Sequence, residues 1–205
     1  MSDLKDLRAE TPSIGRPLQR LEDDRFLQGK GAYVDDLAAA GMVAAAIVRS
    51  PVAHGRIRNI DAGASLKMPG VLTVLSAADV GSPVPRIPLR QEAHPSLLVF
   101  EQPVIADGVV RYVGEPVAIV LAATAAQAAD AAEAVQVDID ELPVVRDRAA
   151  GNDVLLHPAA GSNCAITLRA VRGDVDQAFG QAPYIRRERL SVHRHTAIPM
   201  EPRGL

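Results

Sequence analysis

The stretch from residue 109 to residue 143 constrains the fold of this chain more than any other. An apolar run at 117–121 is followed by an Ala-rich segment and then by an alternating run at 135–140. Thr124 and Gln127 stand at the spacing of a capping box, in which both side chains satisfy amides at a helix start. The order is therefore strand, helix, strand, and we expect the two strands to lie parallel through a right-handed crossover.

The core must be built almost without aromatic side chains. The chain has 205 residues, of which 48% are hydrophobic but only 3% aromatic, with no Trp. Ala, Val, Leu and Ile must therefore fill the interior. The length suits one well-buried domain, or one domain and part of a second.

Further short elements are expected before this unit. Residues 42–48 form an apolar run, residues 56–61 alternate between charged and apolar, and residues 71–75 are apolar and β-branched, so each predicts a strand. Residues 62–67 predict a short helix, and Ser76 predicts a capped turn. This mixture of strands and short helices indicates an α+β fold.

Three irregular segments separate or precede these elements. Residues 1–31 are polar and interrupted by Pro and Gly, which indicates either an extended arm lying over other structure or a flexible leader. The Pro-rich segment 81–103 is either a binding or interface segment or a surface loop without a role. Residues 147–163 are expected to be a linker.

Beyond the linker, one short helix and one strand are expected. Asp174 and Gln177 have capping-box spacing, so a helix should begin there and end at Pro183. Residues 184–193 alternate, which predicts a strand running toward the chain end. The block from Pro199 to Gly204 is typical of the start of further structure, so we expect this chain to be the front piece of a larger protein.

Composition excludes several classes of function. The net charge of −3 argues against a general nucleic-acid binder. One cysteine, Cys164, excludes an internal disulfide and is expected to be a small buried apolar residue. No signal peptide and no apolar run long enough for a membrane span is present, so we expect a soluble cytoplasmic protein.

Few residues point to chemistry. His193 and His195 would share one face of a strand, but a pair without a third ligand makes only a weak metal site. Gly29-Lys30-Gly31 does not follow an apolar strand, so it does not predict nucleotide binding. No Gly-x-Ser-x-Gly motif or other convincing nucleophile is present.

Two charged features have alternative interpretations. Glu115, between Gly114 and Pro116, either aims a carboxylate at a ligand or belongs to a rigid turn before a strand. A basic stripe, defined as Arg186, Arg187, Arg189 and Arg194, is either a solvated face or a clamp for an anionic partner.

Four stretches together resemble one known family. They are Ile14–Leu37, Arg49–Asp61 with Met68–Val71, Arg111–Ala118 continuing to Leu142-Pro143, and Gly173-Asp174, Ala178-Phe179 and Pro199–Gly204. In this order they resemble the start of the molybdenum-binding large subunit of the xanthine dehydrogenase, aldehyde oxidase and carbon monoxide dehydrogenase family.

The resemblance implies an organisation and a chemistry. It implies an N-terminal arm at 1–17, an α/β hammerhead domain of mixed sheet and short helices at 18–146, a linker at 147–163, and the first strands of a molybdopterin-binding domain at 164–205. Complete family members carry molybdopterin, commonly as the cytosine dinucleotide in bacteria. They hydroxylate aldehydes or N-heterocycles, or oxidise carbon monoxide, with water as the oxygen source. Electrons pass to iron–sulfur and FAD partners.

The sequence departs from the family by stopping before the glycine-rich cofactor loops and the catalytic glutamate. No catalytic or metal-binding residue is therefore assigned, and no cofactor is expected to bind to this chain alone. The resemblance places His195, Thr196 and Glu201 near the cofactor, while Ile139 replaces an expected aromatic residue. The chain is expected to be a scaffold that meets a cofactor-domain chain. The alternatives are a non-enzymatic interaction module with the same fold and a non-functional truncated copy.

Overall fold

The structure is a computed structural model that describes residues 15, 17–89, 95–146, 153–192 and 198. The chain divides into two compact units, residues 1–40 with 188–205 and residues 41–187. Among the described residues, no helix has both the length and the apolar character that a membrane crossing requires.

Short helices and strands alternate along the chain. The α-helices are α1 (Asp23–Leu27), α2 (Ala77–Val80), α3 (Ala125–Glu133) and α4 (Val175–Gln181). The 3-10 helices are η2 (Val34–Asp36), η3 (Ser65–Lys67), η4 (Pro95–Phe100) and η5 (Pro158–Ala160). The strands are β1 (Ala44–Arg49), β2 (Gly55–Asp61), β3 (Val71–Leu75), β4 (Arg86–Ile87), β5 (Gln102–Pro103), β6 (Val109–Val110), β7 (Pro116–Ala122) and β8 (Gln136–Glu141).

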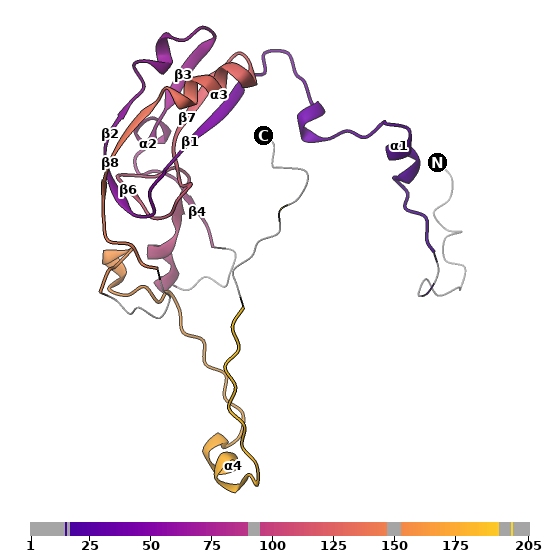
Figure 1. Ribbon diagram of the computed structural model, residues 1–205, viewed down its shortest axis with the longest axis vertical. Coiled ribbons are helices and arrows are strands. Elements are labelled where there is room, and N and C mark those ends of the chain that lie inside the picture. The colour runs from indigo at the N-terminus through magenta and orange to yellow at the C-terminus, as the bar shows by residue number, and fades with distance from the viewer. Residues whose placement is uncertain (1–14, 16, 90–94, 147–152, 193–197, 199–205) are drawn as a thin grey trace. The chain divides into compact units, whose positions relative to one another are not determined.

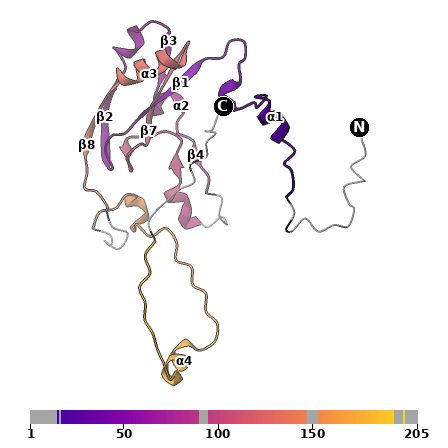
Figure 2. The same cartoon turned by 45° about the vertical axis from the view of Figure 1, so that its right-hand side comes forward.

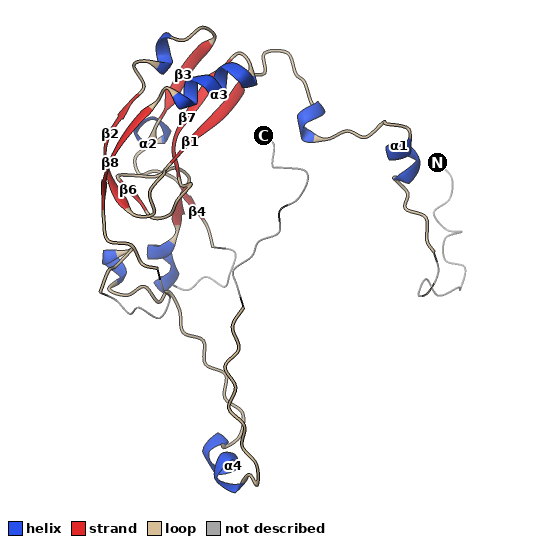
Figure 3. Ribbon diagram, in the orientation of Figure 1, coloured by secondary structure: helices blue, strands red, loops and turns tan. Residues whose placement is uncertain are grey.

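Two three-stranded sheets form the centre of the larger unit (Figures 1 and 3). Their strand orders are β1-β7-β3 and β6-β2-β8, and all neighbours in both sheets are antiparallel. The strands β4 and β5 pair with each other as a separate ribbon. The α+β fold expected from the sequence is therefore confirmed.

Helix α3 covers one face of the β1-β7-β3 sheet, as the two views in Figures 1 and 2 show. Ala128 and Ala131 of α3 are fully buried, and Ala131 packs with Val120 of β7. Small Ala side chains let the helix approach the sheet closely. The helix begins where predicted, and the Thr124 hydroxyl accepts a hydrogen bond from the Gln127 amide at 3.3 Å. The Gln127 side chain differs from the prediction, because its oxygen accepts from the Thr124 hydroxyl at 3.1 Å and not from a backbone amide.

A second apolar cluster joins the two sheets. Val117 of β7 packs with Val110 of β6, and Ile57 of β2 and Ile139 of β8 pack against them. Because strands from both sheets contribute side chains, this cluster holds the two sheets together beside the turn between β6 and β7.

The strand, helix, strand order at 109–143 is confirmed, but the expected parallel pairing is wrong. Strand β7 lies between β1 and β3, whereas β8 pairs with β2 in the other sheet. Both edges of β7 are thus occupied by antiparallel neighbours, so α3 connects two sheets and is not a crossover within one.

The prediction of a strand from residue 184 is wrong for the residues up to 192. Helix α4 precedes this segment and is capped by Asp174, whose carboxylate accepts from the Gln177 amide at 2.9 Å as predicted. Residues 184–192 belong to no strand, and Figure 3 shows them as loop. The alternating pattern alone does not make a strand, because a strand also needs a hydrogen-bonded neighbour.

The prediction for Cys164 is also wrong, because this residue is exposed. Its thiol lies 3.6 Å from the Ile166 carbonyl oxygen and 3.5 Å from the Thr167 hydroxyl. The apolar surroundings that would bury a small residue are missing, since residues 167–172 are all exposed.

Candidate functional site: a buried polar joint

Three of the buried polar side chains in the described part of the chain lie on two turns. Only 1% of Glu115, 2% of Ser50 and 6% of His54 is exposed. Ser50 and His54 belong to the turn between β1 and β2, and Glu115 belongs to the turn between β6 and β7. Burial of polar groups is costly unless they are hydrogen bonded, so their partners define what the site does. We call Ser50, His54, Arg111, Glu115 and Asn163 the polar joint.

The two turns are bonded to each other through their backbones. The Ser50 amide donates to the Glu115 carbonyl at 2.9 Å, and the Gly114 amide donates to the Ser50 carbonyl at 2.8 Å. The Arg49 guanidinium donates to the Gly114 carbonyl at 2.8 Å. Gly114 has a φ of +89°, which side-chain-bearing residues rarely adopt. The turn therefore needs glycine at this position.

The Glu115 carboxylate is directed into its own turn. Oε2 accepts a hydrogen bond from the Arg111 amide at 2.5 Å. Burial raises the pKa of Glu115 above its ordinary value, although bonding to the Arg111 amide and the Arg111 charge oppose the shift. The structure thus supports the interpretation of Glu115 as part of a rigid turn before a strand.

The side chain of Arg111 connects this turn to the segment that follows the sheets. Its Nε donates to the Leu156 carbonyl at 2.9 Å, and its Nη1 donates to the Val109 carbonyl at 3.3 Å. Arg111 is half-buried, so its charge-assisted hydrogen bonds are stronger than those between neutral groups. Glu115 fixes the backbone of Arg111, and Arg111 fixes residue 156.

Asn163 closes the same segment on itself. Its side-chain amide donates to the Val154 carbonyl at 2.6 Å, and its side-chain oxygen accepts from the Leu156 amide at 3.0 Å. Residues 153–163, which belong to the segment predicted to be a linker, therefore form a folded loop.

An aromatic contact also holds this loop. The rings of Phe100 and His157 have centroids 5.1 Å apart and are tilted by 56°. Burial lowers the pKa of His157, and the nearby positive charge of Arg111 lowers it further. A neutral imidazole packed against an aromatic ring is the expected state at neutral pH.

His54, which precedes β2 at the same end of the β6-β2-β8 sheet as Arg111, joins this end to residue 143. Its Nδ1 lies 2.7 Å from the Pro143 carbonyl oxygen, and its own carbonyl accepts from the Leu142 amide at 2.9 Å. A carbonyl oxygen only accepts, so Nδ1 carries a proton in this arrangement. His54 therefore fastens the chain where it leaves β8.

The geometry of the polar joint suits holding chain segments together. The Ser50 hydroxyl donates to the Val52 carbonyl at 2.9 Å and accepts from the Val52 amide at 3.2 Å, so it bonds within its own turn and not to a base. Within the described ranges, no group of three or more His, Cys, Asp or Glu residues could hold a metal ion.

The residues expected near the cofactor, His195, Thr196 and Glu201, lie outside the described residues. The same is true of His193 and Arg194. Of the basic stripe, Arg186, Arg187 and Arg189 are exposed.

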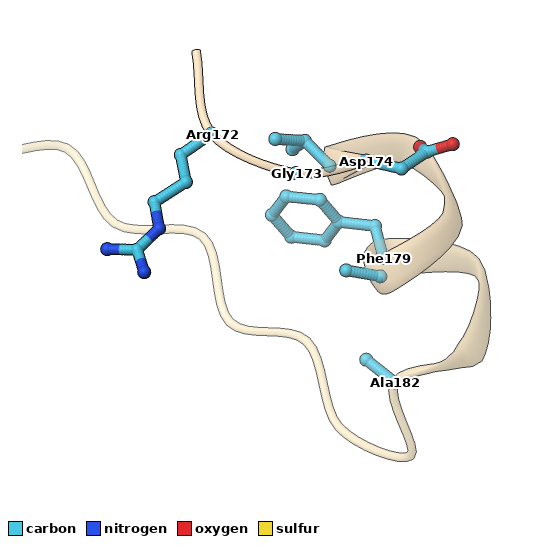
Figure 4. A pocket seen from close by; sticks show the side chains of 7 residues that line it. Arg172, Gly173, Asp174, Phe179 and Ala182 are labelled. Atoms are coloured by element: carbon cyan, nitrogen blue, oxygen red, sulfur yellow. The ribbon is translucent and has the colours of Figure 1, made fainter. Parts of the chain in front are cut away.

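A shallow apolar hollow lies at the start of α4 (Figure 4). Arg172, Gly173, Asp174, Val175, Ala178, Phe179 and Ala182 line it. The Phe179 ring lies beside Gly173, while the Asp174 carboxylate points away from the hollow and caps the helix. With 57% of Phe179 exposed, this hollow is a surface feature and not an enclosed site.

Sequence reasoning singled out Glu115 but missed Ser50, His54, Arg111 and Asn163. Each of these bonds to a backbone group, and several of those groups are distant in sequence. The only local signal was the spacing of Arg111, Gly114 and Glu115 before an apolar strand.

Comparisons with known proteins agree with this architecture. Residues 28–143 match the family described as aldehyde oxidase and xanthine dehydrogenase, a/b hammerhead domain. The chain is 37% identical over 193 residues to the nicotine 6-hydroxylase large subunit of Paenarthrobacter nicotinovorans. The matched region covers 93% of this chain and 24% of that protein. It is 49% identical over 126 residues to the carbon monoxide dehydrogenase large chain of Hydrogenophaga pseudoflava, covering 62% of this chain and 15% of that one.

A solved structure shows the same fold. A crystal structure of Cu,Mo-CO dehydrogenase in its carbon monoxide reduced state matches with a TM-score of 0.54 and 40% sequence identity, over 65% of this chain and 16% of that chain. The present chain thus spans about a quarter or less of the length of these relatives.

Proposed function

Because this chain belongs to the aldehyde oxidase and xanthine dehydrogenase family through its a/b hammerhead domain, we propose that it is the scaffold portion of a molybdenum hydroxylase large subunit. In this proposal the complete enzyme hydroxylates an aldehyde or an N-heterocycle, or oxidises carbon monoxide. The chain alone contributes position and not chemistry.

The polar joint is the observation that carries the scaffold role. Its buried side chains bond to backbone groups of the β1–β2 turn, the β6–β7 turn and the linker. Such bonds hold Pro143 and the loop 153–163 against the ends of the strands. A scaffold that must present a following domain needs a rigid exit of this kind.

The polar joint does not fit molybdopterin. An anionic cofactor needs free backbone amides or positive groups that converge on it. In the polar joint, the amides of Ser50, Arg111 and Gly114 are already bonded within the protein. We therefore assign the cofactor to protein outside the polar joint, and a cytosine dinucleotide form is part of the proposal for the complete enzyme only.

The proposed organisation follows the family. It comprises an arm at 1–17, the hammerhead domain at 18–146, the linker at 147–163 and the start of the molybdopterin-binding domain at 164–205. The proposed partners are a chain or segment carrying the cofactor domain, together with iron–sulfur and FAD subunits. The proposed location is the cytoplasm.

Co-expression tests the proposal. The companion is the part of the Paenarthrobacter nicotinovorans nicotine 6-hydroxylase large subunit that follows the quarter matched here. We expect a stable complex that contains molybdenum by elemental analysis, whereas the chain purified alone should contain none. A companion that folds and never co-purifies with this chain would contradict the scaffold role.

A further inference from the structure

The strand register divides the β1-β7-β3 sheet into two faces. Directly paired residues of neighbouring strands project to the same face. Ala46 pairs with Val120, which packs on α3, so this row belongs to the covered face. Because side chains alternate along a strand, Ala45 and Ile47 lie on the opposite face.

The opposite face carries two cross-strand rows. One row consists of Ala45, Leu121 and Thr73, and the other consists of Ile47, Ile119 and Leu75. Only Thr73 is polar. We call these six residues the open apolar face.

The open apolar face is incompletely covered. Ile47 on the edge strand β1 is 45% exposed, and Ile119 and Leu121 on the central strand are half-buried. A single exposed Ile is ordinary, but adjacent apolar rows on three strands form a continuous patch, which marks an interaction site.

The β2–β8 pair provides a contrast within the same unit. Its exposed residues are charged or polar, and Arg58 and Asp140 form an ion pair with side chains 53% and 49% exposed. Arg56 stands opposite Asp140 in the register, and both are exposed. Charges of this kind suit water, so the unit has one solvated strand pair and one apolar face that suits protein.

We propose that the open apolar face is the surface on which this domain docks against the remainder of the large subunit, an inference that rests on the proposed function. The relatives carry about three quarters of their length beyond the part matched here, so they hold the protein needed to cover this face. The surface of the remaining large subunit that contacts the open apolar face should also be apolar.

The size of the open apolar face favours the remainder of the large subunit, and not a second copy of this chain, as the protein that covers it. A stable interface between separate proteins buries about 800 Å² on each partner and involves about 20 residues. Six side chains, several of them already half-buried, fall short of that area. They suffice as part of an interdomain contact, in which connection along a chain or a larger surrounding interface supplies the rest.

The test compares two lysine substitutions in the co-expression described above. Ile47→Lys places a charge on the open apolar face. Asn59→Lys places the same residue at an exposed position of β2. We expect Ile47→Lys to reduce recovery of the companion by at least about tenfold, because a buried unpaired charge opposes docking, and Asn59→Lys to leave recovery unchanged.

The outcomes separate this inference from the proposed function. A wild-type chain that never binds the companion overturns both. A wild-type chain that binds, with equal recovery of the Ile47→Lys variant, overturns only the docking face. A wild-type dimer that Ile47→Lys converts to a monomer by light scattering shows a second copy as the occupant and also overturns it.

A second measurement applies should Ile47→Lys fail to fold. Carbene footprinting of the wild-type chain, with and without the companion, reports the accessibility of individual side chains. Protection of Ile47 and Leu121 by the companion, with none at Arg56, supports docking on this face. Unchanged labelling of both residues in the complex contradicts it.

Discussion

Replacing Arg111 with methionine should release the linker while leaving the two sheets folded. Methionine keeps an unbranched apolar stem but cannot donate to the Leu156 and Val109 carbonyls, which lie 2.9 Å and 3.3 Å from the guanidinium. In this variant the two sheets keep their interstrand hydrogen bonds and their apolar clusters. The affected part is the loop 153–163, whose bond to Arg111 spans 45 positions of sequence.

The expected size of the effect follows from the lost bond. A hydrogen bond to a charged group stabilises by about 1.5–3 kcal/mol. The population in which the loop is detached should therefore rise about 10- to 150-fold, since 1.4 kcal/mol corresponds to about tenfold. The Phe100–His157 contact remains in the variant, so the loop should open more often without staying open.

Thermolysin cleavage within 153–163 measures this opening, because the cleavage rate follows the open population when closing is fast. Hydrogen exchange of the Leu156 amide, which donates to Asn163, gives a second measure. The pKa of His157 should also rise toward its ordinary value, since burial and the charge of Arg111 now lower it.

Arg49→Met is the matched control. It removes a guanidinium bond to the Gly114 carbonyl in the same region, at 2.8 Å, without touching the linker. We expect linker cleavage in this variant to stay within about twofold of wild type, since no bond of the loop is lost. Equal cleavage in both variants, or wild-type cleavage in Arg111→Met, would refute the role of Arg111 as the link between turn and linker.

Three further substitutions test buried positions of the larger unit. In Gly55→Ala, the new methyl would clash with Ile139 Cγ2 and would lie 2.9 Å from the Asp140 carbonyl oxygen. The free energy of unfolding, measured in urea, should fall by about 1–3 kcal/mol. An unchanged urea midpoint would contradict the close approach. Burial raises the pKa of Glu115 above 4.5, so the free energy of unfolding should fall as pH rises through that raised value; Glu115→Gln should remove this slope, and its persistence would assign it to another group. Ser65 is fully buried with an unbonded hydroxyl, so Ser65→Ala should be neutral or stabilising by about 1 kcal/mol in thermal unfolding, and a marked loss would reveal a hidden partner.

The sequence predicted the elements that depend on neighbouring residues. The caps at Thr124 and Asp174 involve residues three positions away, so their spacing is visible in the sequence. The strands β1, β2, β3, β7 and β8 follow local apolar or alternating patterns. Strand pairing depends on partners far along the chain, and the expected pairing of the strands around α3 was therefore wrong.

The polar joint was beyond sequence reasoning for the same physical reason. Arg111 and His54 bond to backbone carbonyls 45 and 89 positions away. A backbone carbonyl has no residue identity, so nothing in the sequence names the partner. Glu115 could be singled out because its partner lies four positions away within a Gly- and Pro-defined turn.

The distribution of apolar side chains links the composition to the proposed role. Among the described residues, every buried apolar residue except Leu97 and Ile105 is Ala or Val. Several larger apolar residues remain exposed, including Ile47, Leu72 and Leu98. A core of small side chains gains less from burial, since the gain scales with apolar area. In our proposal, the open apolar face adds apolar contacts with the rest of the subunit. The proposal therefore gives the scarcity of aromatic residues in the sequence and the exposed apolar side chains of the sheet one physical explanation.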